Sequence, residues 1–175
     1  RTNCWPATCG DGVLRTDLEE GDPGFEACDD GNPFSADGCS ENCTVEIPED
    51  CIAVPNRSPL AFYCVERLAF ASARRACQAA GADLASISDW DDFATLYAFS
   101  QQVNRGDVTV GMTDPDGTIG AQPWAWLGRP SGFAGLADGE PNLPVGPACA
   151  VIKMGSNGGM YDRGCTELYT FLCEF

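Results

Sequence analysis

The stretch SARRACQAAG, residues 72–81, predicts an α-helix. Ser72 is a favourable helix N-cap, the alanine-rich run is made of good helix formers, and Gly81 is typical of the position just past a helix end. A second helix is predicted over SDWDDFATLYAFSQQV, residues 88–103, with Ser88 as its cap and acidic residues in its first turn. Its apolar stripe consists of Trp90, Phe93, Leu96 and Tyr97.

After the second helix the sequence changes to short strand-like pieces. They are VTVGM (108–112), WAWL (124–127), CAVIK (149–153) and YTFLCEF (169–175). Between residues 113 and 147 lies a long Gly/Pro-rich stretch interrupted only by WAWL, and long ordered loops are more often functional than filler. The pattern of two helices followed by a small sheet predicts an α+β fold.

The charge of the chain excludes several partners. Its formal net charge is −16, and residues 1–50 hold 13 of the 26 acidic residues against only two of the 10 basic ones. Such a surface repels nucleic acid and anionic lipid, and no apolar run approaches the ~20 residues needed to cross a bilayer. We therefore expect no nucleic-acid partner and no membrane insertion. Calcium, a cationic partner and simple solubility all remain compatible with the charge.

The cysteines indicate an oxidising compartment. Eleven cysteines are spread along 175 residues, histidine is absent, and the only close pair is Cys39-x-x-x-Cys43. This favours disulfides over zinc, and hence a secreted or cell-surface protein. Because the chain begins at Arg1 with no apolar leader, we expect a mature product from which a signal has been removed.

Residues 1–49 form a candidate first module with too little apolar area for a core of its own. The line CGDGVLRTDLEEGDPGFEACDDGNPFSADGCSENCTVE, residues 9–46, resembles the cysteine-rich repeat named after myxobacterial secreted proteins. The resemblance points to a bacterial source and implies two local disulfides among four cysteines. These are Cys9, Cys28, Cys39 and Cys43.

The turn DDGNPFSADG, residues 29–38, is a candidate calcium site. Calcium takes 6–8 oxygen ligands, and a turn bearing several carboxylates can supply them, although this spacing is not that of an EF-hand. The alternative is that the same side chains cap their own turns. The candidate metal ligands are Asp29, Asp30, Asn32 and Asp37.

Residues 50–175 resemble a long-form C-type lectin-like domain. The matching segments are ARRACQAAGADLASI (73–87), VGMTDPDG (110–117), WAWLG (124–128), GEPN (139–142), Cys149, Cys165 and FLCEF (171–175). The resemblance implies two helices, small antiparallel sheets and a long loop region. It also implies three disulfides: Cys51 with Cys64, Cys77 with Cys173, and Cys149 with Cys165. Cys4 is left over, with a partner upstream of Arg1 or in another chain as alternatives to a free thiol.

The sugar site of such domains is only partly present. Sugar-binding members hold calcium with five side chains, of which this chain keeps Glu140, Asn142 and Asp162. Pro147 stands in place of a glutamate and Tyr161 in place of an asparagine, and neither is a good calcium ligand. The resemblance therefore implies an incomplete site. Asp114, Asp116 and Asp138 lie in the same loop region and could substitute.

The sequence favours a binding protein over an enzyme, since no nucleophile–base pair is visible. The first hypothesis is a secreted or cell-surface adhesion module that recognises a protein or glycan through residues 113–147. Trp126 is a candidate ligand contact there, although Trp90, Trp124 and Trp126 are more typical of core residues than of a sugar-stacking platform. The alternative is a self-associating structural subunit of an extracellular fibre, sheath or appendage.

Overall fold

The chain folds into two compact units in a computed structural model. The first consists of Arg1–Pro48 with Ala79–Gly81, and the second of Glu49–Gln78 with Ala82–Phe175. The structure describes residues 8–15, 17–29, 31–35, 38–55, 57, 59–103, 106–114, 124–143, 146–155 and 159–175. Within these ranges, no helix combines the length and the apolar character that a membrane span requires.

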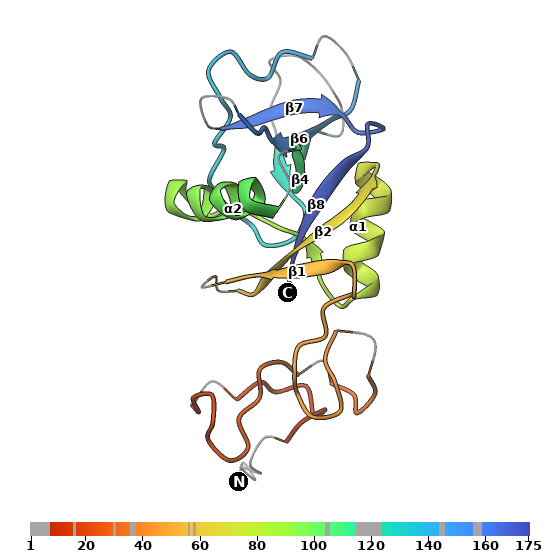
Figure 1. Cartoon of the computed structure of the whole chain (residues 1–175), viewed down its shortest axis with the longest axis vertical. Helices are drawn as coiled ribbons and strands as arrows, with labels where there is room; N and C mark the ends of the chain where they lie inside the picture. Colours follow the sequence, from red (N-terminus) through yellow and green to blue (C-terminus); the bar gives the residue numbers. More distant parts are fainter. Residues whose placement is uncertain are drawn as a thin grey trace, which may run out of the picture. The chain divides into compact units, whose positions relative to one another are not determined.

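The second unit is built on one mixed sheet with two helices (Figure 1). The helices are α1 (Phe70–Ala79) and α2 (Trp90–Val103), drawn to the right and to the left of strands β2 and β8 in Figure 1. The strands are β1 (Cys51–Val54), β2 (Ala61–Leu68), β3 (Asp83–Leu84), β4 (Val108–Asp114), β5 (Ala125–Trp126), β6 (Ala148–Ile152), β7 (Met160–Gly164) and β8 (Tyr169–Glu174). Their order is β1-β2-β8-β4-β6-β7, with β3 paired to β8 and β5 to β4.

The sheet differs in one respect from the expected small antiparallel sheets. Val108 and Thr109 of β4 pair in parallel with Thr170 and Phe171 of β8, whereas the other pairs are antiparallel. This parallel ladder joins the hairpin β1–β2 and the strands β6–β7 into one mixed sheet. The α+β class with two helices is as predicted.

Both helices begin one or two residues from the expected caps. Ser72 lies inside α1, which begins at Phe70, where the backbone N–H donates to the carbonyl of Cys165 at 3.1 Å. Burial of Phe70 against the fold thus sets the start of α1, in preference to the local capping signal. In α2 the cap is Asp89 rather than Ser88, because its Oδ1 accepts two backbone N–H groups of the first turn at 3.0 and 2.9 Å.

The main core cluster of the second unit joins the sheet and α2. It includes Tyr63, Ile87, Phe93, Leu96, Met112, Ile152, Met160 and Leu172, whereas the equally buried Phe62 and Leu84 lie outside this cluster. Phe93 and Leu96 of the predicted stripe are buried, but Trp90 is 56% exposed, which corrects its expected core position. Trp90 is the first residue of α2, and its ring covers the surface side of Phe93 at 5.5 Å and of Phe133 at 5.0 Å, edge-on to both.

Gly111 marks the closest backbone crossing in the described core. Its N–H donates to the carbonyl of Ala85 at 2.8 Å, and a Cβ at this position would lie 2.5 Å from the carbonyl oxygen of Leu84. Only glycine fits there. The crossing holds β4 against the segment that leads from β3 to α2.

Each unit contains its own disulfides. The second unit contains Cys51–Cys64, which also face each other in the β1–β2 register, together with Cys77–Cys173 and Cys149–Cys165. The first unit contains Cys9–Cys43 and Cys28–Cys39. The described residues between 8 and 48 contain no helix, and their strand pairing is limited to the bridge Cys39↔Val45. Cross-links therefore replace an apolar core, as expected for such a small unit. Cys4 lies outside the described residues.

Candidate functional site

The long loop is bonded to β7, the strand at the edge of the sheet. The N–H of Met160 in β7 donates to the carbonyl of Gly135, and the N–H of Ala137 donates back to the carbonyl of Met160, each at 2.9 Å. These two bonds form a short parallel bridge, Leu136↔Met160. The bridge therefore fixes the backbone in the middle of loop segment 131–143, shortly before the residues of the candidate sugar site.

Two further contacts hold the same segment from the side of α2. The indole N–H of Trp126 donates to the carbonyl of Phe133 at 2.8 Å, and Ser131 Oγ donates to the carbonyl of Ile87 at 2.7 Å. The half-buried ring of Trp126 packs against the core. The indole nitrogen of Trp126 is thus already bonded to the loop backbone. This geometry favours a structural role for Trp126, which supports the loop, over the proposed contact with a ligand.

Glu140, Asn142 and Asp162 converge, although twenty residues separate the last two in sequence. Asp162 accepts the backbone N–H of Asn142 at 3.0 Å and that of Leu143 at 2.7 Å, one on each carboxylate oxygen. The side-chain amide of Asn142 donates to Glu140 Oε1 at 2.9 Å. The bond between Glu140 and Pro141 is cis. Buried Asp162 on β7 thus organises the loop that carries the other two side chains.

The two carboxylates share a strongly perturbed electrostatic environment. Burial, and then the nearby Asp162 carboxylate, raise the pKa of Glu140 to about 7. Burial alone would raise the pKa of Asp162 as well, but hydrogen bonds from Glu140 and from the two loop N–H groups outweigh it and lower that pKa. Glu140 Oε2 is buried with no hydrogen bond in the ionised state, so a proton on Glu140 that points to Asp162 satisfies both groups.

This arrangement does not fit a complete sugar-binding calcium site. An unsatisfied carboxylate oxygen on Glu140 suits a cation, but both oxygens of Asp162 already accept backbone N–H groups. Pro147 is exposed and offers no side-chain oxygen, and the Tyr161 ring lies against Lys153 and Arg163, which are themselves cations. Three side chains fall well short of the 6–8 oxygens that calcium takes.

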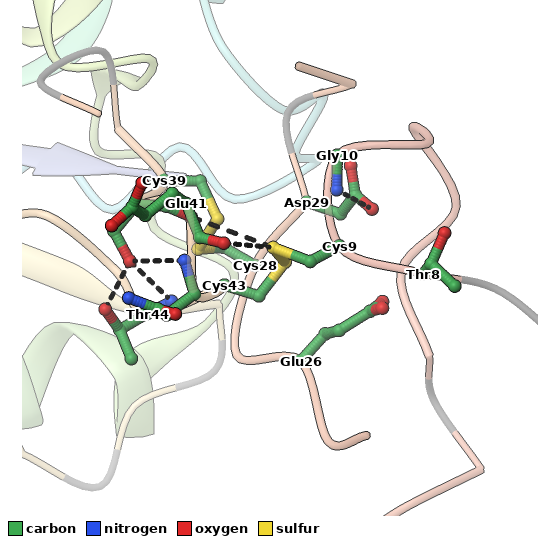
Figure 2. Close-up of a disulfide and its surroundings, with 12 residues drawn as sticks. Thr8, Cys9, Gly10, Glu26, Cys28, Asp29, Cys39, Glu41, Cys43 and Thr44 are labelled. Carbon is green, nitrogen blue, oxygen red and sulfur yellow. Dashed lines mark hydrogen bonds between the residues drawn. A yellow bond between two sulfur atoms is a disulfide. The ribbon is translucent and has the colours of Figure 1, made fainter. Parts of the chain in front are cut away.

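In the first unit, Asp29 is fully engaged in hydrogen bonds. Its Oδ2 accepts the N–H groups of Gly10 and Asp11 at 3.1 and 3.2 Å, and its Oδ1 accepts those of Gly12 and Gly31 at 2.8 Å each. These four donors lower the pKa of Asp29 against the opposing effect of burial. Figure 2 shows the carboxylate beside Gly10 and the disulfide network. The geometry favours the turn-stabilising interpretation of Asp29 over the calcium interpretation.

The neighbouring candidates give little support to a metal. Asn32 Oδ1 accepts the N–H of Phe34 at 2.8 Å in a local turn, and Asp30 and Asp37 lie outside the described residues. Donor atoms of Glu26, Asp29 and Cys43 lie within 4.8 Å of one another. However, Cys43 is bonded to Cys9 and therefore has no thiolate to offer a metal (Figure 2).

One cluster at the second-unit site was not predicted from the sequence. Lys153 Nζ lies 4.6 Å from the centroid of the Tyr161 ring, and the Arg163 guanidinium carbon lies 5.5 Å from it. The alternation of Tyr161 and Arg163 with buried residues could have indicated their shared face. That signal required a strand over residues 160–164, which the sequence pattern did not predict.

The comparisons with known proteins identify the fold. No protein-family model and no curated protein matches the chain. Among solved structures, the carbohydrate-recognition domain of the mouse scavenger receptor C-type lectin aligns with a TM-score of 0.58 at 23% identity, covering 74% of this chain and 95% of that one. Human lithostathine aligns with a TM-score of 0.60 at 21% identity, over 74% and 98% of the two chains.

A third structure, the C-type lectin domain of murine dendritic cell inhibitory receptor 2 in complex with N-glycan, aligns with a TM-score of 0.57 at 20% identity. It covers 74% of this chain and 98% of that domain. At these identities the similarity defines a fold, and the fold is C-type lectin-like.

Proposed function

We propose that the chain is a secreted or cell-surface binding module that recognises a glycan through loop segment 131–143 and the adjacent end of β7. The observation that carries this proposal is the fixation of the segment by Met160 and Asp162. Their backbone and side-chain bonds hold Asn142 at an exposed position. A loop ordered before binding loses little conformational entropy when a ligand arrives.

Two further observations support this proposal. Five disulfides in the described residues suit an oxidising, extracellular environment. The C-type lectin-like fold includes a neighbour that was solved with an N-glycan. The same neighbours give no support to the alternative of a fibre subunit.

The proposed recognition does not depend on calcium. The loop is already held by Asp162, because both of its carboxylate oxygens accept loop N–H groups without a cation. Binding should therefore persist in a chelator. The side-chain nitrogen of Asn142 donates to Glu140. The oxygen of the same amide can accept a hydrogen bond from a sugar hydroxyl.

A glycan array tests the proposal directly. The purified chain is applied with about 2 mM calcium in one run, above the ~0.1–1 mM dissociation constants of extracellular calcium modules, and with an excess of chelator in the other. We expect the same glycans to bind in both. Asn142→Ala should weaken binding, and Asn42→Ala, an exposed asparagine in the first unit, is the matched control.

Three outcomes would change the conclusion. Binding abolished by chelator would restore a calcium-dependent site, and equal effects of the two asparagine variants would remove the site from segment 131–143. Failure to bind any glycan would reject glycan recognition and leave a protein ligand as the remaining hypothesis.

A further inference from the structure

The outer face of β7 carries a compact group of two cations and an aromatic ring. Along β7 the buried Met160 and Asp162 alternate with the partly exposed Tyr161 and Arg163. Lys153 follows directly after β6, whose register pairs Val151 with Tyr161. The three side chains therefore share one face of the β6–β7 hairpin, with Lys153 and Arg163 reaching the ring from opposite directions along the strand. We refer to Lys153, Tyr161 and Arg163 as the cationic cluster.

This cluster is unusual for the chain that contains it. Lys153 is the only lysine of a protein with 26 acidic residues and a formal net charge of −16. Three of the described arginines form ion pairs with carboxylates, namely Arg15, Arg57 and Arg74. Arg163 instead donates to a neutral acceptor, the backbone carbonyl of Asp162 at 2.7 Å, and its charge reaches Glu140 only as a weak influence that lowers the pKa of that group.

Tyr161 explains how both cations are held at this place on the hairpin. The negative face of an aromatic ring attracts cations, and both Lys153 Nζ and the Arg163 guanidinium lie within the ~6 Å over which this attraction acts. The ring thus positions an ammonium and a guanidinium before any ligand arrives. Donors of this kind suit oxyanions, since charge-assisted hydrogen bonds to sulfate or carboxylate are the strong ones.

We propose that the cationic cluster binds an oxyanion carried by the glycan ligand, either a sulfate ester or a carboxylate. The inference rests on the proposed function, because it assigns a substrate class, acidic saccharides, to the same end of β7. Charge complementarity selects this class: most of the acidic surface repels a polyanion, so such a ligand is admitted only where positive groups are gathered. Acidic groups along the saccharide accept hydrogen bonds from Lys153 and from the N–H groups of Arg163 that do not donate to the Asp162 carbonyl.

Three dextrans that share one backbone test the inference. Binding of the full chain to dextran sulfate, carboxymethyl dextran and unmodified dextran is measured by isothermal titration calorimetry at low and at physiological salt. We expect both charged polymers to bind more tightly than dextran, with affinity that falls as salt rises. A preference between the two charged polymers distinguishes a sulfate from a carboxylate ligand.

Variants then assign the binding to the cluster. Lys153→Gln and Arg163→Gln should each weaken binding of the preferred charged polymer about tenfold, the order expected for loss of one charge-assisted contact. Arg75→Gln removes the same charge from an exposed position on α1 and should change little. Tyr161→Phe keeps the ring and should preserve binding, whereas Tyr161→Leu should weaken it. The thermal midpoint of each variant verifies that it folds.

Several results would overturn the inference. The first is equal binding of charged and neutral dextran. The second is an equal loss of affinity in Lys153→Gln and in Arg75→Gln. The third is unchanged affinity for the charged polymer in both single variants Tyr161→Leu and Arg163→Gln. These failures are distinguishable from failure of the proposed function. A chain that binds neutral glycans on the array through Asn142 but ignores charged polymers retains the proposed function and loses only the acidic class.

Discussion

Arg57 should be the most sensitive charged position of the second unit. Its side chain is only 5% exposed and donates to Asp92 at 2.7 Å and to Glu174 at 2.8 Å, as well as to the backbone carbonyls of Pro59 and Ser86. Glu174 is itself 3% exposed. Arg57 therefore joins the loop after β1, the start of α2 and the end of β8 through one guanidinium group.

Replacing Arg57 by methionine leaves the Glu174 carboxylate buried, with the backbone N–H of Ser86 as its remaining hydrogen bond on Oε1. Loss of one partner from a buried ion pair costs about 3–5 kcal/mol of unfolding free energy, because the other charge remains desolvated. The Arg74–Asp83 pair offers a contrast, since its side chains are 34% and 21% exposed. Removing Arg74 should cost roughly 1 kcal/mol or less, as is usual for accessible pairs.

Urea unfolding followed by tryptophan fluorescence, with the disulfides intact, measures both effects. We expect Arg57→Met to shift the transition strongly and Arg74→Met weakly. The double variant Arg57→Met with Glu174→Leu should recover part of the loss, because it removes the stranded charge. If the Arg57 and Arg74 variants unfold within about 1 kcal/mol of each other, the buried network does not stabilise the fold as argued.

Three further predictions concern single positions. Because the pKa of Glu140 is raised from 4.5 to about 7, its contribution to stability is complete below pH 4.5 and is lost as the pH rises towards 7. Glu140→Gln should flatten the fall of the thermal midpoint across that range. Asp29→Asn should loosen the first unit to the same extent with calcium and with chelator, as hydrogen exchange of the Gly10, Gly12 and Gly31 amides would report. Gly111→Ala should cost about 1–3 kcal/mol in denaturant unfolding, because the added methyl meets the Leu84 carbonyl at 2.5 Å.

The helices and the α+β class could be predicted because they depend on local patterns. Alanine-rich and amphipathic stretches mark α1 and α2 within two residues, and the cysteine-bearing segments carry the resemblance to the C-type lectin-like fold. The start of α1 could not be predicted, since the N–H of Phe70 bonds to the distant Cys165. At the start of α2 two adjacent capping residues, Ser88 and Asp89, are available, and only the structure shows that Asp89 accepts the first-turn N–H groups. The parallel ladder between β4 and β8 joins residues about sixty positions apart, which no local pattern encodes.

The chemical state of the acidic side chains was beyond sequence reasoning for a different reason. A carboxylate that faces a cation and one that faces four backbone N–H groups, as Asp29 does, look the same in a sequence. The roles of Glu140 and Asp162 likewise depend on which loop amides reach them. The cationic cluster was missed because Lys153 follows β6 whereas Tyr161 and Arg163 lie on β7, and only the β6–β7 register brings Lys153 to the other two.

The bridge between Met160 and the long loop has a consequence for how the molecules behave in a crowded solution. β7 ends the sheet, and a terminal strand with open N–H and C=O groups is a template on which a second chain can add its own strand. Gly135 and Ala137 form hydrogen bonds with the N–H and C=O groups of Met160. The loop therefore covers the edge strand at Met160, a protection that we call the guard, and it also carries the candidate site. Changes at Glu140 or Asn142 leave this guard in place, whereas deletion of residues 133–138 would open the margin and promote aggregation.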